Sequence, residues 1–277
     1  MPSVRPEDLP DFADPPVVET VLGIQFERVL GWTTAHAGML RDDLGNREFA
    51  IEEHPPLPTV LERFGPPQPP AVEVTFEQRP PANRIWLVGA DQAELIQIQA
   101  DRLIHNWRKQ GANSYPRYEL VRDAFRREVG ELLGFLETHG LGPLRINQCE
   151  VSYINHIRPF AGFNPHADVA RLLRVGYAWT ATAFLPNPED TAPQFRFVMR
   201  GTDGAEVGRL HVTAQPAWRR EDHSPILILT LTARGAPLGE GVDGAFAFLD
   251  LGRRWIVKGF EDLTTEEMHQ KWGIVHG

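Results

Sequence analysis

The sequence has a single cysteine, Cys149, which excludes an internal disulfide and any zinc site that needs two thiolates. One cysteine is typical of a protein from a reducing compartment. The first ten residues lack the basic-then-apolar pattern of a secretion signal. Nothing in the chain approaches the roughly 18 unbroken apolar residues of a membrane span. We therefore expect a cytoplasmic protein without a membrane contact.

The motifs of common enzyme classes are also absent. There is no G-x-S-x-G elbow, Walker loop or dinucleotide fingerprint, and the ten histidines show no H-x-x-x-H spacing. Cys149 and His156 superficially resemble a cysteine–histidine pair, but on a regular strand residues seven apart point to opposite faces. We expect a buried, inert thiol, no catalytic residue, no metal and no cofactor.

Basic residues are outnumbered, with 28 Lys and Arg against 37 Asp and Glu and a net charge of −9. Nucleic acid is therefore an unlikely main partner, because phosphate binding needs a concentrated basic surface. The arginines at 117, 122, 126 and 127 share one predicted helix region with interspersed acids. That mixture is typical of a solvated helix face.

The chain is organised around residues 95–118. Ile96 and Ile98 fall on one face of a predicted strand, with Gln97, Gln99 and Asp101 on the other. Residues 102–109 continue this strand or bend at a bulge. The best helix of the first half follows at 118–139, where apolar residues recur at steps of three and four.

The order of elements predicts an α+β fold with two similar β-α-βββ-α halves, at 17–142 and 143–277, after a flexible N-terminal tail at 1–16. Antiparallel sheets would pack on helices in a saddle-like or helix-grip-like layout. Residues 91–98 and 203–210 share the pattern D-x-A-E-[LV]-x-x-[IL], which favours an internal duplication. Whether the halves share one sheet is left open.

The expected strands lie at 17–26, 72–78, 84–89, 95–100, 145–157, 178–184, 195–200, 206–214 and 225–233. The expected helices lie at 32–44, 118–139, 165–175 with Asn164 as N-cap, and 244–262, followed by a short terminal helix from 264 or 265. Residues 55–70 are proline-rich and should be irregular, apart from a possible turn of helix at 57–64.

The candidate recognition residues are polar and aromatic side chains near the two predicted central strands. One interpretation places them on a ligand or partner surface; the other has aromatic side chains anchor the helix to the sheet while acids pair with arginines. They are Asp101, Arg102, Asn106, Trp107, Arg108, Tyr115, Arg117, Tyr118, Glu150, Tyr153, Asn155 and His156.

Four segments of the chain carry a family resemblance. They are Q-x-Q-x-D-R-x-x-x-N-W-R-K from Gln97, Y-P-R-Y from Tyr115, N-Q-C-E-V-S-Y-I-N-H from Asn147 and L-T-T-E-E-M-H-Q-K-W-G from Leu263. With the opening from Pro15 to Phe26, the chain resembles a sporadically distributed bacterial protein family. No activity is assigned to this family, so the resemblance implies no catalytic residues. Sporadic distribution implies an accessory, defence-type gene context.

The sequence therefore favours a non-enzymatic binding or interaction protein, with a protein partner or itself as a homo-oligomer. Aromatic and arginine clusters are enriched in interfaces, and no catalytic motif competes with this interpretation. The alternative is a small-ligand binder or enzyme that uses a polar groove between the halves, with Arg102, Glu150, Asn155 and His156 as polar contacts. A third interpretation, nucleic-acid binding on an open sheet, predicts an affinity that falls steeply with salt.

Overall fold

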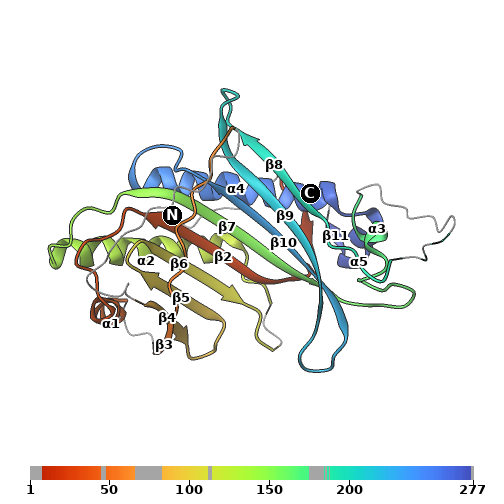
Figure 1. Cartoon of the computed structure of the whole chain (residues 1–277), viewed down its shortest axis with the longest axis horizontal. Coiled ribbons are helices and arrows are strands. Elements are labelled where there is room, and N and C mark those ends of the chain that lie inside the picture. The colour runs from red at the N-terminus through yellow and green to blue at the C-terminus, as the bar shows by residue number, and fades with distance from the viewer. Residues whose placement is uncertain are drawn as a thin grey trace.

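Strands from both predicted halves join in one antiparallel sheet, in the order β3-β4-β5-β6-β2-β7-β10-β9-β8 (Figure 1). This computed structural model describes residues 8–44, 48–65, 83–111, 114–174, 184, 186 and 188–275. The strands are β2 (Val17–Phe26), β3 (Phe49–His54), β4 (Arg84–Gly89), β5 (Glu94–Gln99), β6 (Arg102–Arg108), β7 (Ile146–Ile157), β8 (Gln194–Arg200), β9 (Glu206–Trp218) and β10 (Pro225–Gly235).

The two halves meet where β2 pairs with β7. From this centre the sheet runs through β6, β5 and β4 on one side and through β10, β9 and β8 on the other. The α+β class is thereby confirmed, and one sheet serves both halves. The β4–β5 and β8–β9 turns are built alike, since Asp91 Oδ1 accepts the Ala93 N–H at 2.9 Å and Asp203 Oδ1 accepts the Ala205 N–H at 3.0 Å. Common ancestry of the halves stays a prediction.

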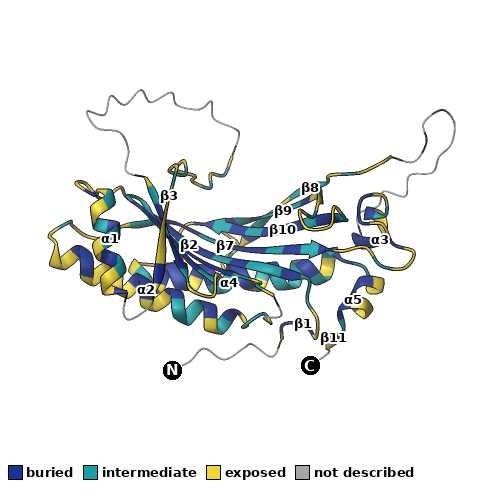
Figure 2. Cartoon of the chain, turned by 90° about the horizontal axis from the view of Figure 1, so that it is seen from below, coloured by how far each residue is buried: buried dark blue, intermediate teal, exposed yellow. Residues whose placement is uncertain are grey.

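Helices cover one face of the sheet, and the other face is free of them among the described residues (Figure 2). Helix α2 (Tyr118–Thr138) packs on β2 and β6, α4 (Gly241–Leu263) packs on β7, β10 and β9, and α1 (Thr34–Asp43) lies against β4 and β5. The buried stripe of α2 follows the predicted spacing, with Val121, Phe125, Val129, Leu132 and Leu136 facing the sheet. Alternation along the strands then decides which side chains enter the core between the sheet and the helices.

Several expectations differ from the structure. Residues 102–109 neither continue the preceding strand nor bend at a bulge, because the turn at Ala100 and Asp101 reverses the chain and β6 pairs antiparallel with β5. The edge strand β3 was not predicted, because most of its side chains are exposed and it shows no clean alternation. Helix α3 covers only Val169–Leu172 and has Asp168 at its N-cap, because Asn164 instead accepts the His166 N–H in a preceding turn. Residues 57–64 contain no helix. The strands predicted at 72–78 and 178–184 lie outside the described residues.

Residues 8–16 are packed, in contrast to the expected flexible tail. Strand β1 (Asp11–Phe12) pairs with β11 (Ile274–Val275), just after α5 (Glu266–Trp272). The Phe12 ring lies edge-on to Phe260 at 5.5 Å, and the carboxylate of Asp8 pairs with Lys258 at 3.0 Å. The apolar ring of Phe12 thus anchors a stretch whose many prolines and acids predict a tail.

In the described part of the chain, no helix combines the length and the apolar character that crossing a membrane requires.

Candidate functional site

A row of four polar side chains crosses the helix-free face of the sheet, called here the polar face. Gln99 of β5 lies opposite Arg102 of β6, Arg102 lies opposite Gln25 of β2, and Gln25 lies opposite Gln148 of β7. Directly paired residues on antiparallel strands project to the same side. The row therefore runs across four neighbouring strands and spans the junction of the two halves.

An extended stretch, residues 57–63, lies along this row and is called the crossing segment. It appears in Figure 1 as the orange trace that passes over the central strands. Gln99 holds both main-chain groups of Leu57, since its Oε1 accepts the N–H at 3.0 Å and its Nε2 donates to the carbonyl at 3.0 Å. Arg102 Nη2 donates to the carbonyl of Pro58 at 2.9 Å.

The same pattern continues over the central pair of strands. Gln25 Oε1 accepts the Val60 N–H at 3.0 Å, and Gln148 Oε1 accepts the Glu62 N–H at 2.8 Å. Three strand spacings from β5 to β7 amount to about 14 Å, and five extended residues span about 17 Å. An almost extended chain that crosses the strands therefore reaches all four residues of the row, with contacts at Leu57, Pro58, Val60 and Glu62.

Glu62 is the one side chain of the crossing segment that is deeply held. Its carboxylate pairs with Arg209 and accepts from His211 Nε2 at 2.8 Å, and it is only 8% exposed. Arg209 also donates to the carbonyl of Arg63 at 2.7 Å and stacks over the Phe64 ring at 4.6 Å. A guanidinium and an imidazole on β9 thus form an acid-binding end to the row.

A second polar network lies beside the row on the same face. Arg84 donates to Gln97 Oε1 at 2.9 Å, Gln97 Nε2 donates to Asn106 Oδ1 at 2.8 Å, and Asn106 Nδ2 donates to Glu19 at 2.6 Å. Burial raises the pKa of Glu19, while the hydrogen bond from Asn106 opposes the rise. This network holds polar groups of β4, β5, β6 and β2 in fixed positions.

A cavity of about 120 Å³ opens at the junction of the halves, where Gln25, Arg102 and Gln148 of the row line it. Gly23 leaves its floor without a side chain, and the Glu150–Arg234 ion pair, at 2.5 Å, forms one wall. Arg102 Nε and Gln148 Nε2 are buried here without a hydrogen-bond partner among the described residues. Burial also lowers the pKa of Arg102. The cavity therefore offers donors to a small ligand that carries hydrogen-bond acceptors.

The aromatic candidates lie on the opposite side of the sheet, under the helices. The hydroxyls of Tyr115 and Tyr153 are 2.8 Å apart, and burial raises the pKa of both. Tyr118 donates to Asp250 at 2.9 Å, and Trp107 packs on Tyr115 with ring centres 5.3 Å apart. These contacts fasten the start of α2 and the middle of α4 to the sheet, as the anchoring interpretation expects.

The structure thus divides the twelve candidates into two sets. Asp101, Arg102, Asn106, Arg108, Glu150 and His156 belong to the polar face; Trp107, Tyr115, Arg117, Tyr118, Tyr153 and Asn155 lie on the helix side. The set of polar contacts expected in a groove between the halves is therefore incomplete, because Asn155 has the opposite parity to Glu150 and His156 and lies on the helix side. Asp101 sits in the β5–β6 turn, where it accepts from Gln99 at 2.6 Å and from Thr59 at 3.0 Å.

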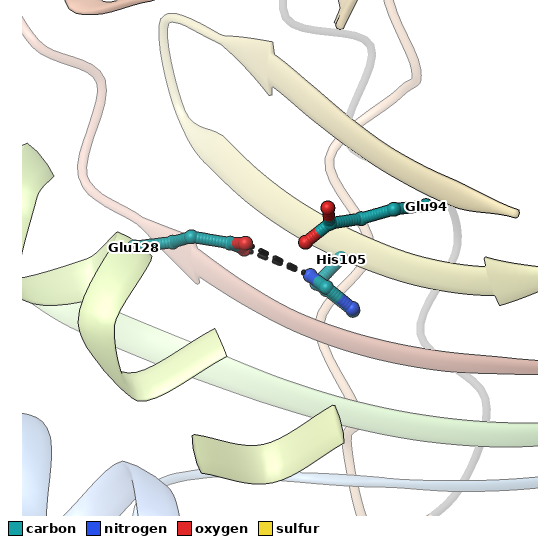
Figure 3. A group of neighbouring side chains, drawn as sticks. All are labelled: Glu94, His105 and Glu128. Carbon is teal, nitrogen blue, oxygen red and sulfur yellow. Dashed lines mark hydrogen bonds and ion pairs between the residues drawn. The ribbon is translucent and has the colours of Figure 1, made fainter. Parts of the chain in front are cut away.

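Three residues on the helix side bring possible metal ligands together (Figure 3). The donor atoms of Glu94, His105 and Glu128 lie within 4.8 Å of one another. Both carboxylate oxygens of Glu128 are 3.0 Å from His105 Nδ1, the distance of a hydrogen bond. A proton on Nδ1 therefore accounts for this geometry without a metal ion, as a buried hydrogen-bonded pair between β6 and α2.

Cys149 faces the helices, and His156 faces the other way, as the strand parity requires. Burial raises the pKa of the Cys149 thiol to about 12. At neutral pH the thiol is therefore protonated and a poor nucleophile.

The site residues missed from the sequence are mainly glutamines and β9 residues: Gly23, Gln25, Gln97, Gln99, Gln148, Arg209, His211 and Arg234. A signal was available for the glutamines, since they alternate with apolar residues on predicted strands. An alternating polar residue ordinarily indicates only a solvated face.

Comparison with protein-family models gives no match, and comparison with curated proteins gives none either.

Proposed function

We propose that this protein is a non-enzymatic binding protein that holds a polypeptide partner on the polar face of its sheet. The observation that carries the proposal is the row formed by Gln99, Arg102, Gln25 and Gln148, whose side chains hold main-chain groups of an extended segment. Binding through main-chain groups is the usual way in which proteins recognise extended peptides.

The chemistry of the row suits this role. A glutamine amide presents one acceptor and two donors, so it can pair with a peptide group as another strand would. Gln99 does so with Leu57 through both of its polar atoms. Such contacts give affinity that depends little on sequence, and the charged end at Arg209 and His211 adds selectivity.

Photo-crosslinking tests this proposal in cells of the host. A photoreactive amino acid placed at Thr230 on β10 reports on the polar face, and one at Leu120, which is 62% exposed on α2, is the matched control. We expect a crosslinked polypeptide at Thr230, weakened when Gln25 and Gln148 are changed to Ala. Crosslinks only at Leu120, or equal crosslinks with and without the two glutamines, would contradict the proposal.

The central cavity supports a second candidate function, the binding of a small polar ligand by Arg102, Gln148 and Arg234. Gly23→Ala is a precise test, because the added Cβ would lie 3.4 Å from Ile104 Cγ1, an ordinary contact, and would fill part of the floor. Native mass spectrometry should show a retained small molecule on the wild-type chain and its loss from G23A. Masses at whole multiples of 31.2 kDa in both proteins would reject this candidate.

A further inference from the structure

We propose that the crossing segment is an internal ligand, and that the partner is an extended polypeptide whose acidic side chain replaces Glu62 between Arg209 and His211. The inference rests on the proposed function and names both the class of partner and the part of the chain that competes with it. The partner and the crossing segment would take turns on one row of side chains.

Polar contacts hold the crossing segment at the surface of the protein, as they would hold a bound peptide. Val60 is 37% exposed and Leu61 is 41% exposed, and none of residues 57–63 belongs to the buried core. Detachment would therefore expose little apolar surface and would exchange hydrogen bonds with the protein for hydrogen bonds with water. The core between the sheet and the helices would stay intact.

The acid-binding end of the row, Arg209 and His211, indicates that the partner carries an acidic side chain. Arg209 and His211 lie on β9, and in the described chain their contact with a carboxylate is made by Glu62. Without the crossing segment these two groups would stand on the sheet without that acid. A partner with Glu or Asp at the matching position would restore the charge-assisted hydrogen bonds, which are stronger than neutral ones.

The row favours a polypeptide over a nucleic acid. Three glutamine oxygens, of Gln25, Gln99 and Gln148, accept main-chain N–H groups. A nucleic-acid backbone has no N–H donors to offer them, and the chain carries a net charge of −9. Single-stranded oligonucleotide is nevertheless a useful competitor in the test, because Arg84, Arg102, Arg209 and Arg234 share the face.

The experiment measures the binding of a fluorescent peptide with the sequence of residues 54–64 to the full-length chain. V60P/E62P removes two N–H groups that the row accepts, together with the carboxylate that Arg209 and His211 hold. L61P is the matched control, since the Leu61 N–H has no acceptor in the described chain. An internal competitor acts at an effective concentration of about a millimolar, so the peptide should bind V60P/E62P roughly tenfold or more tightly than wild type or L61P.

Two further measurements make the result specific. The same peptide with Ala in place of its Glu should bind V60P/E62P more weakly, and Arg209→Ala in that background should abolish the difference between the two peptides. The milder variant E62A, whose folding is checked by circular dichroism beside that of V60P/E62P, should bind the peptide with intermediate affinity.

Equal, weak peptide binding by all folded variants would overturn the inference. Preferential binding of oligo-dT over the peptide by V60P/E62P would overturn it as well. If crosslinks form at Thr230 while the peptide fails to bind, the proposed function stands and the internal-ligand inference falls. If the peptide binds while no polypeptide is crosslinked in cells, the inference about the segment stands and the proposed function falls.

Discussion

Gln25 and Gln148 lie opposite each other on the two central strands, and their side-chain oxygens accept the N–H groups of Val60 and Glu62 in one crossing segment. The two glutamines come from different halves of the chain, 123 positions apart (148 − 25). One segment of the chain is thus held jointly by both halves at the place where β2 meets β7. The pairing of these strands forms a row of hydrogen-bonding side chains that neither half has alone.

Q25A/Q148A should loosen the crossing segment without unfolding the sheet. The amide hydrogens of Val60 and Glu62 lose their acceptors and should exchange with solvent much faster, while the amides in β2 and β7 keep their protection. Hydrogen exchange with mass spectrometry measures both. Gln215→Ala, at an exposed glutamine on β9, is the control and should leave all of these rates unchanged. Unaltered exchange at residues 60 and 62 would show that other contacts hold the segment.

Gly252→Ala should destabilise the protein, because the new Cβ would lie 2.6 Å from Val151 Cγ1 and 3.0 Å from Ala233 Cβ. Overpacking of this kind typically costs about 1–3 kcal/mol in the free energy of unfolding. Gly130→Ala in α2 is the matched change: Gly130 is exposed, and its new Cβ would meet no atom within 4 Å. It should stabilise the helix by up to about 1 kcal/mol. Measured by urea unfolding, the free energy of unfolding should decrease in the Gly252→Ala variant and increase in the Gly130→Ala variant.

The buried pair of His105 and Glu128 should behave as a unit. Removal of one partner from a buried hydrogen-bonded pair costs about 1–3 kcal/mol, so E128A should lower the urea midpoint. E128Q keeps an acceptor for His105 Nδ1 and should lose less. H105L/E128L removes both polar groups and should recover much of the loss of E128A. H105L and E128L, each measured alone, complete the double-mutant cycle. If their separate losses add up to the loss of H105L/E128L, the two side chains do not depend on each other.

Stability should fall as the pH is lowered through the range in which free histidine titrates. Burial is the largest cause that lowers the pKa of His269, followed by the positive charge of Arg174. As the pH falls, His269 therefore takes up a proton in the unfolded chain before it does so in the folded chain. The contribution of the neutral His269 side chain to stability is full above its unfolded pKa and is lost as the pH falls below about 6.5. Glu19, with a raised pKa, acts in the opposite direction at more acidic pH.

The urea midpoint of wild type and H269Q, measured from about pH 7.5 to 5.5, tests this expectation. Gln can still donate to Thr264 Oγ1, which His269 Nε2 contacts at 2.9 Å. The variant should therefore show a shallower pH dependence than wild type. An identical slope for the two proteins would assign the pH dependence to other groups.

Local patterns in the sequence determined most of the elements and the class of the fold. Alternation in β5 and β7 predicted strands, apolar and β-branched residues predicted β2 and β10, and the apolar stripe of α2 predicted a helix that packs on the sheet. Parity along a strand also placed Cys149 and His156 on opposite faces. These features depend only on the periods of two residues in a strand and 3.6 residues in a helix, which can be recognised within a short stretch of sequence.

Only the tertiary structure decided which polar residues meet. Strand order and register are set by contacts between residues far apart in the chain, so Gln25, Gln99 and Gln148 could not be placed in one row from their own neighbourhoods. The position of the crossing segment is fixed through its main-chain groups, which hydrogen-bond to those side chains. Its own side chains therefore need no periodic pattern that the sequence would reveal. Parity along β7 separates Tyr153 from Glu150, but only the packing of the helices decided that Tyr153 lies under them and Glu150 on the polar face.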